Sequence, residues 1–151
     1  MDYEKELILM VGPIGSGKTT FAKSLETDSS IRISQDEMGR KAYLKYFREA
    51  LKDGIPRVII DRMNFDRKQR ERFIKPAREA GYCVTIFEID YNPVTCLERV
   101  IKRENHPTIP KDSEDLAKKI IFDYMEKYEH PEPSEYDNYN LVPLEKNLYD
   151  R

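Results

Sequence analysis

The sequence predicts an α/β fold: a mostly parallel sheet of four to five strands with helices on both faces. Short apolar runs alternate along the chain with segments of helical periodicity, an order typical of βα units. The run "RVIID" at 57–61 is almost continuously apolar, as expected of a strand covered by helices on both sides. The length of 151 residues indicates a single domain spanning 1–151.

The first half of the chain is expected to alternate strand and helix twice before a third strand. In order, these elements are a strand at 7–11, a helix from about 17 to 26, a strand at 31–34, one helix after Asp36 and a strand at 57–61. The helix after Asp36 is predicted to be continuous up to "GIP" at 54–56. Its apolar residues near one face are Met38, Leu44, Phe47 and Leu51.

The second half continues the alternation. Its expected elements are a helix at 66–80, a strand at 82–90, a helix from about 93 to 104, a lid-like loop at 105–112, a helix from 113 to about 129, an acidic loop and a last strand at 141–144. Pro76 is expected to bend the first of these helices, and Gly81 to cap it. Pro143 favours an edge position for the last strand.

Composition narrows the class of protein. Hydrophobic residues make up 39% and charged residues 36%, which suits a soluble globular domain. The first apolar run is too short for a signal peptide or a membrane span, so a cytoplasmic protein without a membrane partner is expected. Two cysteines, Cys83 and Cys96, predict neither a disulfide framework nor a zinc cluster. The net charge of −2 means that a polyanion would need a local basic surface.

The stretch "GPIGSGKTT" has the Walker A spacing, and it lies between an expected strand and an expected helix. Its backbone N–H groups and the helix N-terminus would bind phosphates, with Lys18 at the β and γ phosphates and Thr19 at Mg²⁺. The alternative, an ordinary glycine turn, does not explain the full pattern. The expected nucleotide-binding residues are Gly12, Pro13, Ile14, Gly15, Ser16, Gly17, Lys18, Thr19 and Thr20.

Asp36 lies just after the second expected strand. In open α/β sheets the ligand crevice lies beyond the carboxyl ends of the strands, so this side chain is expected to face the triphosphate. A carboxylate there can accept the proton of an attacking hydroxyl, as the catalytic aspartate of other kinases does. The other interpretation is an N-cap for a helix beginning at Glu37, and the two roles are compatible.

Asp61 ends the third expected strand, beside the glycine-rich loop. A carboxylate of the Walker B type can hold Mg²⁺ there, directly or through water, so Thr19 and Asp61 are the expected metal ligands. Asn64 is expected to bind phosphate or orient the acceptor. The alternative for Asn64 is an Asx turn or a cap for the helix at Asp66.

Two arginines, Arg99 and Arg103, lie four residues apart and therefore on one face of a helix, at its lid end. Arginines from a lid can neutralise the charge that develops on a transferred phosphoryl group and exclude water from it. The alternative is a pair of solvated arginines bonded to Glu98 or Glu104. Position alone does not separate these two interpretations.

The segment "DRKQRERFIKPAR" at 66–78 is the one marked basic stretch of the chain. Its cations are Arg67, Lys68, Arg70, Arg72, Lys75 and Arg78. A charged run is usually a solvated helix face, but a polyanionic acceptor would use such a patch.

The order of these motifs resembles that of the polynucleotide 5′-hydroxyl kinase family, a branch of the P-loop phosphotransferases. "GPIGSGKTT" is similar to its phosphate loop, "RISQDEMGR" to the motif with the catalytic aspartate, "IIDRMNFDRKQR" to the strand-three motif and "RVIKR" to the lid motif. The phosphate loop and "DRMN" also resemble the kinase modules of fungal tRNA ligases, which repair broken RNA. The likeness covers nearly the whole chain and implies a P-loop kinase fold with an arginine-bearing lid.

The resemblance also implies chemistry: ATP or GTP as phosphate donor, Mg²⁺ as cofactor and the 5′-OH end of RNA or DNA as acceptor. The implied catalytic residues are Lys18 at ATP, Asp36 at the 5′ hydroxyl, and Arg99 and Arg103 at the transferred phosphate. The implied acceptor-binding residues are Arg40, Asp61, Arg62 and Asn64. Family kinases are often fused to other repair modules, so this chain is expected to work either alone or with separate ligase or phosphatase partners.

Three positions depart from the family pattern. Gln35 stands where family members often have arginine, Val100 stands where asparagine is usual, and Gly39 takes the place of a basic residue that Arg40 matches only approximately. These departures concern acceptor preference more than the reaction.

Three functions are compatible with the motifs. The first is a polynucleotide 5′-hydroxyl kinase in end healing, which the basic segment favours. The second is a kinase of a nucleoside or other small-molecule hydroxyl, which the acidic pI favours. The third is a nucleotide-dependent switch, in which Asp36 and the lid arginines would have no evident role.

Overall fold

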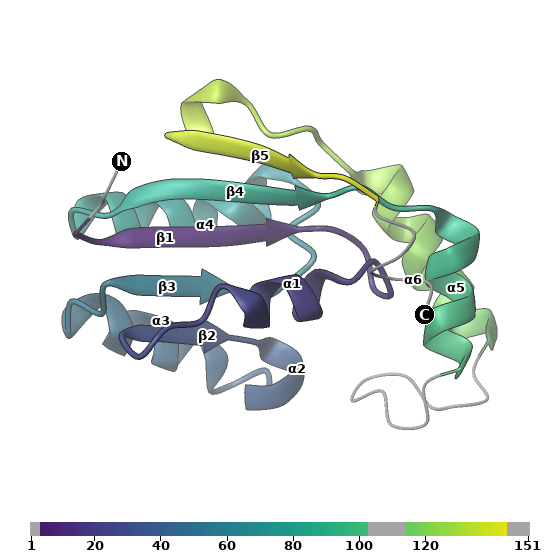
Figure 1. Cartoon of the computed structure of the whole chain (residues 1–151), viewed down its shortest axis with the longest axis horizontal. Helices are drawn as coiled ribbons and strands as arrows, with labels where there is room; N and C mark the ends of the chain where they lie inside the picture. The colour runs from purple at the N-terminus through teal and green to yellow at the C-terminus, as the bar shows by residue number, and fades with distance from the viewer. Residues whose placement is uncertain (1–3, 103–113, 145–151) are drawn as a thin grey trace.

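A computed structural model describes residues 4–102 and 114–144 of the chain (Figure 1). Its five strands are all parallel and lie in the order β2-β3-β1-β4-β5. The strands are β1 (Glu6–Val11), β2 (Ser30–Ile33), β3 (Arg57–Ile60), β4 (Cys83–Ile89) and β5 (Asn138–Val142). The helices are α1 (Lys18–Ser24), α2 (Gln35–Met38), α3 (Tyr43–Lys52), α4 (Arg67–Glu79), α5 (Pro93–Lys102), α6 (Glu114–Lys127) and the 3-10 turn η1 (Pro133–Glu135). The predicted α/β class is confirmed.

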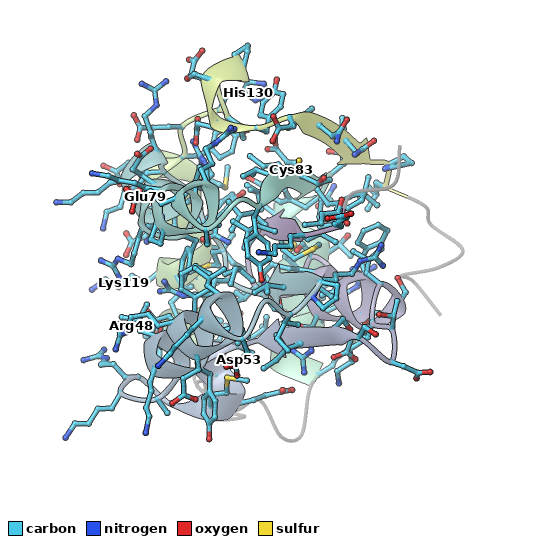
Figure 2. All side chains as sticks on the ribbon, turned by 90° about the vertical axis from the view of Figure 1, so that its left-hand side faces the viewer. Arg48, Asp53, Glu79, Cys83, Lys119 and His130 are labelled. Atoms are coloured by element: carbon cyan, nitrogen blue, oxygen red, sulfur yellow. The ribbon has the colours of Figure 1, made fainter. Side chains whose placement is uncertain are left out.

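Helices cover both faces of the sheet, as predicted. In Figure 1, α1 lies in front of the sheet, α3 and α4 lie behind it, and α5 and α6 lie beyond the carboxyl ends of the strands. Figure 2 shows the side chains of Arg48 from α3 and Glu79 from α4 on the same side of the molecule. Helices α1, α2 and α5 follow β1, β2 and β4 in the chain, so all three begin near the carboxyl edge of the sheet.

The alternation of side chains along β1 divides the core into two layers. Leu7 and Leu9 pack in the cluster that contains Phe47 of α3 and Phe73 of α4. Ile8 and Met10 pack in a second cluster around Ala22 of α1. Burial of each aliphatic side chain of this kind contributes about 1.5–3 kcal/mol to the free energy of folding, so packing in both layers stabilises β1.

The segment after Asp36 differs from the prediction of one continuous helix. It forms the short α2 and then α3, separated at Gly39, whose φ is 91°. A left-handed backbone stops a right-handed helix, and glycine adopts it without the steric penalty of a Cβ. The apolar spacing that predicted one helix belongs mainly to α3.

The last strand also begins earlier than predicted. β5 starts at Asn138, inside the segment expected to be a loop, and ends at Val142, one residue before Pro143. Its polar residues are compatible with an edge strand, which has one side open to solvent. The edge position and the effect of Pro143 agree with the prediction.

The end of α4 agrees with the prediction for Gly81. Gly81 has φ 86° and donates its N–H to the Arg78 carbonyl, ending α4 as a left-handed cap. Both Cys83 and Cys96 are free thiols. No helix within 4–102 or 114–144 is long and apolar enough to cross a membrane.

Candidate active site

The glycine-rich loop joins β1 to α1. Gly15 and Gly17 have φ angles of 75° and 93°, which an L side chain rarely adopts. The buried Ser16 hydroxyl donates to the Pro13 carbonyl at 2.7 Å, and Lys18 is the first residue of α1. The loop therefore has the strand, turn and helix context that phosphate binding at a helix N-terminus requires.

Helix α5 packs directly onto this loop. A Cβ at Gly15 would lie 2.4 Å from the backbone oxygen of Cys96, so only glycine allows this approach. The Arg99 guanidinium donates to the Gly15 carbonyl at 3.2 Å. Arg99 thus lies at the P-loop rather than in open solvent, whereas Arg103 lies outside the described residues.

Asp61 lies at the end of β3 and is 5% exposed. Its Oδ2 accepts a hydrogen bond from the Thr19 hydroxyl at 3.0 Å, and its Oδ1 lies 3.5 Å from the Lys18 ammonium. The structure therefore brings Lys18, Thr19 and Asp61 together at the glycine-rich loop. Oδ1 is buried and accepts no hydrogen bond in the described part of the protein.

The oxygen atoms around Asp61 fit Mg²⁺. Magnesium in phosphotransferases is commonly bound by one or two carboxylates together with substrate phosphates and water. Asp61 and Thr19 supply one carboxylate and one hydroxyl beside the phosphate loop. No cluster of three or more His, Cys, Asp or Glu side chains able to hold a metal occurs in 4–102 or 114–144.

Arg32 is a site residue that the sequence analysis missed. It lies on β2 with its side chain only 8% exposed, and it donates to Asp61 Oδ2 at 2.7 Å. The same guanidinium pairs with Glu37 of α2 and lies 3.8 Å from Glu26. The available signal was the alternation in "IRI", which turns Arg32 away from the apolar face that Ile31 and Ile33 share.

Asp36 is exposed on the first turn of α2, beyond the carboxyl end of β2. The N-cap of α2 is Ser34 and the helix begins at Gln35, so the interpretation of Asp36 as a cap is wrong. Arg62 is close enough to Asp36 for the two charges to interact. Asp36 is therefore at the sheet edge where the loop lies, on the side of β2.

Arg62 connects Asp36 to the core of the α3–α4 face. Its guanidinium stacks on the Tyr43 ring at 4.9 Å and approaches the Phe73 ring at 6.0 Å. Burial lowers the pKa of Arg62, and Tyr43 and Asp36 oppose that shift. Arg40 is exposed in the turn between α2 and α3.

Asn64 lies inside the protein rather than on the surface of the crevice, at 1% exposed. Its Nδ2 donates to the Met10 carbonyl at 2.7 Å and to the Arg62 carbonyl at 3.2 Å. These two hydrogen bonds hold the turn at 61–64 against the end of β1. The cap of α4 is Asp66, whose carboxylate accepts from the Gln69 N–H at 2.8 Å, so Asn64 does not cap this helix.

The sheet, the loop and the helix arrangement define a P-loop protein with a kinase-type α/β fold. The chain belongs to the AAA domain family, whose sequence pattern matches residues 7–131. Among curated proteins, none matches the chain.

Solved structures share the fold at low sequence identity. A fungal RNA kinase is 18% identical with a TM-score of 0.69, over 97% of this chain and 78% of that one. Chaetomium thermophilum Kti12 in complex with ADP-AlF3 is 20% identical with a TM-score of 0.63, over 93% and 90%. The Pnkp1/Rnl/Hen1 RNA repair complex contains a chain that is 19% identical with a TM-score of 0.59, over 85% and 48%. At these identities the similarity establishes the P-loop kinase fold.

Proposed function

We propose that the protein is an NTP-dependent polynucleotide 5′-hydroxyl kinase, which transfers the γ-phosphate of ATP or GTP to the 5′-OH end of RNA or DNA. The observation that carries the proposal is the phosphate loop with Lys18, Thr19 and Asp61. The turn that follows Arg62 is bonded to this loop, because the Gly12 N–H donates to the Met63 carbonyl at 3.1 Å, and the charge of Arg62 interacts with that of Asp36. In this proposal a donor site and an acceptor site share the carboxyl edge of the sheet.

In the proposed reaction the 5′ oxygen attacks the γ-phosphorus in line as Asp36 accepts its proton. The bond between the γ-phosphorus and the β–γ bridging oxygen breaks, leaving a nucleoside diphosphate. Lys18 and Arg99 balance the negative charge on the transferred group, because both cations lie at the loop. Arg103 is proposed to join Arg99 in this role, and Thr19 and Asp61 would hold Mg²⁺, which supplies charge neutralisation on the phosphates when bound.

Acceptor contacts are proposed for Arg62, which faces Asp36, and for the exposed Arg40 on the turn beyond α2. Asn64 acts from inside the protein by holding the turn that carries Arg62. Asp61, with Thr19 and Arg32 already on its Oδ2, is assigned to the metal rather than to the acceptor.

Two structural neighbours support a polynucleotide acceptor: the fungal RNA kinase and the RNA repair complex. They also make separate repair enzymes reasonable partners. The second candidate, a kinase of a small hydroxyl, is favoured by a shikimate kinase structure that is 17% identical with a TM-score of 0.50. The lower structural similarity and the basic surface of α4 make it the weaker candidate.

Label transfer from γ-labelled ATP with Mg²⁺ tests the proposal. The acceptors are short 5′-OH RNA and DNA, and the same oligomers carrying a 5′ phosphate serve as controls. We expect label on the 5′-OH oligomers only, and at least about a 100-fold loss with Asp36→Ala, since general base catalysis contributes about 10²–10⁴-fold. Label on neither polymer would overturn the proposed function, whereas full activity of Asp36→Ala would remove only the assigned base.

A further inference from the structure

We infer that the outer face of α4 is a docking surface for the single-stranded part of the acceptor, beyond its 5′ end. The inference rests on the proposed function and adds a second binding surface to it. An open groove of about 730 Å³ runs over the N-terminal and middle turns of α4. Four cations line it, Arg67, Lys68, Arg72 and Lys75, against two carboxylates, Glu71 and Glu129.

Only some of the cations in the basic segment 66–78 are accessible to a ligand. Arg70 is 0% exposed and bonds to Glu135 at 2.7 Å, so it belongs to the interior. Arg67 lies 3.6 Å from Glu132 and 3.8 Å from Glu135. Lys68 and Lys75 are exposed, and neither has a carboxylate within ion-pair distance in 4–102 or 114–144.

The spacing of these two lysines suits an extended ligand. Residues 68, 72 and 75 follow one another at intervals of four and three, so they form a stripe along one face of the helix. From 68 to 75 the helix rises by about 10.5 Å, at 1.5 Å per residue. The stripe is thus a line of positive charge rather than a single point.

Side-chain contacts connect the groove residue Arg72 to the acceptor side of the candidate active site. The Arg72 guanidinium donates to the Tyr43 hydroxyl at 3.5 Å, and the Tyr43 ring carries the Arg62 guanidinium at 4.9 Å. Arg62 in turn interacts with the charge of Asp36. These contacts therefore link Asp36, the proposed base, to the groove through Arg62, Tyr43 and Arg72.

Charge favours a nucleic acid strand as the occupant. The whole protein has a net charge of −2, so a polyanion would have to be attracted by a local group of cations. Lys68 and Lys75, which have no ion-pair partner within 4–102 or 114–144, provide such a group on one face of α4. Binding by lysines to a phosphate backbone carries no sequence preference. Such a surface would bind a strand of any sequence and present its end to Asp36.

The test combines binding and kinetics for Lys68→Gln/Lys75→Gln. Lys23→Gln/Lys52→Gln is the control, because it makes the same charge change at two exposed lysines on α1 and α3. Fluorescence anisotropy follows a 5′-OH 15-mer as salt rises from 50 to 200 mM. Phosphorylation rates are then measured with the 15-mer and with a 5′-OH trinucleotide.

We expect the groove variant to flatten the plot of log affinity against log salt by about 1.4, from two lost contacts at about 0.7 each. The two contacts are taken to contribute no binding free energy at 1 M salt. At 0.1 M salt the KM for the 15-mer should then rise about 25-fold. The KM for the trinucleotide and all control values should stay unchanged.

An unchanged salt slope in the groove variant would overturn the inference, as would an equal loss in the control. If the groove variant phosphorylates the 15-mer with wild-type kinetics, the inference fails as well, but the proposed function stands. Conversely, if neither oligomer is phosphorylated by the wild type, the proposed function fails and the anisotropy data alone decide whether α4 binds a strand.

Discussion

The Arg32 guanidinium on β2 donates to the Asp61 carboxylate at the end of β3, at 2.7 Å. The same group also pairs with Glu37, one residue after Asp36 on α2. One nearly buried cation therefore joins the carboxylate beside the phosphate loop to the short helix that carries the proposed base.

Arg32→Gln is expected to lower the free energy of unfolding by about 3 kcal/mol, because it leaves the buried Asp61 without its closest cation. Urea unfolding measures the change. Lys45→Gln is the control, since Lys45 and Glu49 are exposed and 4.0 Å apart and such pairs contribute under about 0.5 kcal/mol. Equal stabilities of the two variants would show that Arg32 is not a structural link.

Gly15→Ala is expected to separate α5 from the phosphate loop, because the added methyl group would lie 2.4 Å from the Cys96 oxygen. Gly81→Ala is the matched control: its φ of 86° imposes similar backbone strain, but nothing lies within 4 Å of the new Cβ. Both variants should lose about 1–2 kcal/mol of stability from strain. Only Gly15→Ala should also lose nucleotide binding, measured by calorimetry, and normal binding would contradict the packing of α5 on the loop.

Arg70→Met is expected to cost about 3–5 kcal/mol of stability, because Glu135 would remain as a buried charge without its main partner. Adding Glu135→Gln should recover part of that loss by removing the charge. For comparison, Arg78→Met breaks a half-exposed pair with Asp137 at 3.8 Å and should cost under about 1 kcal/mol. If thermal and urea unfolding give the same small loss for Arg70 and Arg78, the buried pair is not structural.

Cys96 should react slowly with alkylating agents. Burial raises the pKa of the Cys96 thiol from 9.0 to about 11, although Arg99 and Lys18 oppose the shift. In a Cys83→Ser variant at pH 8, iodoacetamide should label Cys96 at least about 100-fold more slowly in the folded protein than in urea, since the thiolate is the reactive form. Equal rates would contradict the burial of this thiol beside the loop.

The pH dependence of stability follows from the same shift. A folded-state pKa above the unfolded value favours the neutral thiol, so its contribution to stability is complete below about pH 9 and is lost as the pH rises through about 11. Wild type should therefore lose more stability than Cys96→Ala over this interval, as measured by urea unfolding. A parallel loss in both proteins would assign the alkaline sensitivity to other groups.

Sequence patterns predicted the features that are determined by residues close together in the chain. The Walker A spacing required a strand, a tight turn and a helix, and Gly15, Gly17 and Lys18 have that arrangement. Apolar periodicity likewise predicted most strands and helices to within a few residues. The continuous apolar core of "RVIID" correctly indicated a strand buried on both faces.

Contacts between distant elements could not be predicted in this way. Arg32 becomes a site residue only because β2 pairs with β3, which brings it beside Asp61, and nothing in "RIS" specifies that pairing. The sequence groups Arg70 with the other cations of segment 66–78. In the structure it is buried against Glu135, which lies 65 residues later in the chain. The glycine at 39 carried the signal for the break between α2 and α3, but helical spacing on both sides of it outweighed that signal.

The measurement that tests the central claim most directly is the ratio of kcat/KM for two 5′-hydroxyl acceptors: an RNA 15-mer and the free nucleoside of its 5′ residue. Both carry the same 5′ hydroxyl, but only the 15-mer is long enough to reach beyond the proposed active site. A polynucleotide kinase should favour the 15-mer by at least about 100-fold, which corresponds to about 2.7 kcal/mol of added transition-state binding. A ratio of one or less would contradict the polynucleotide assignment and identify the protein as a small-molecule kinase.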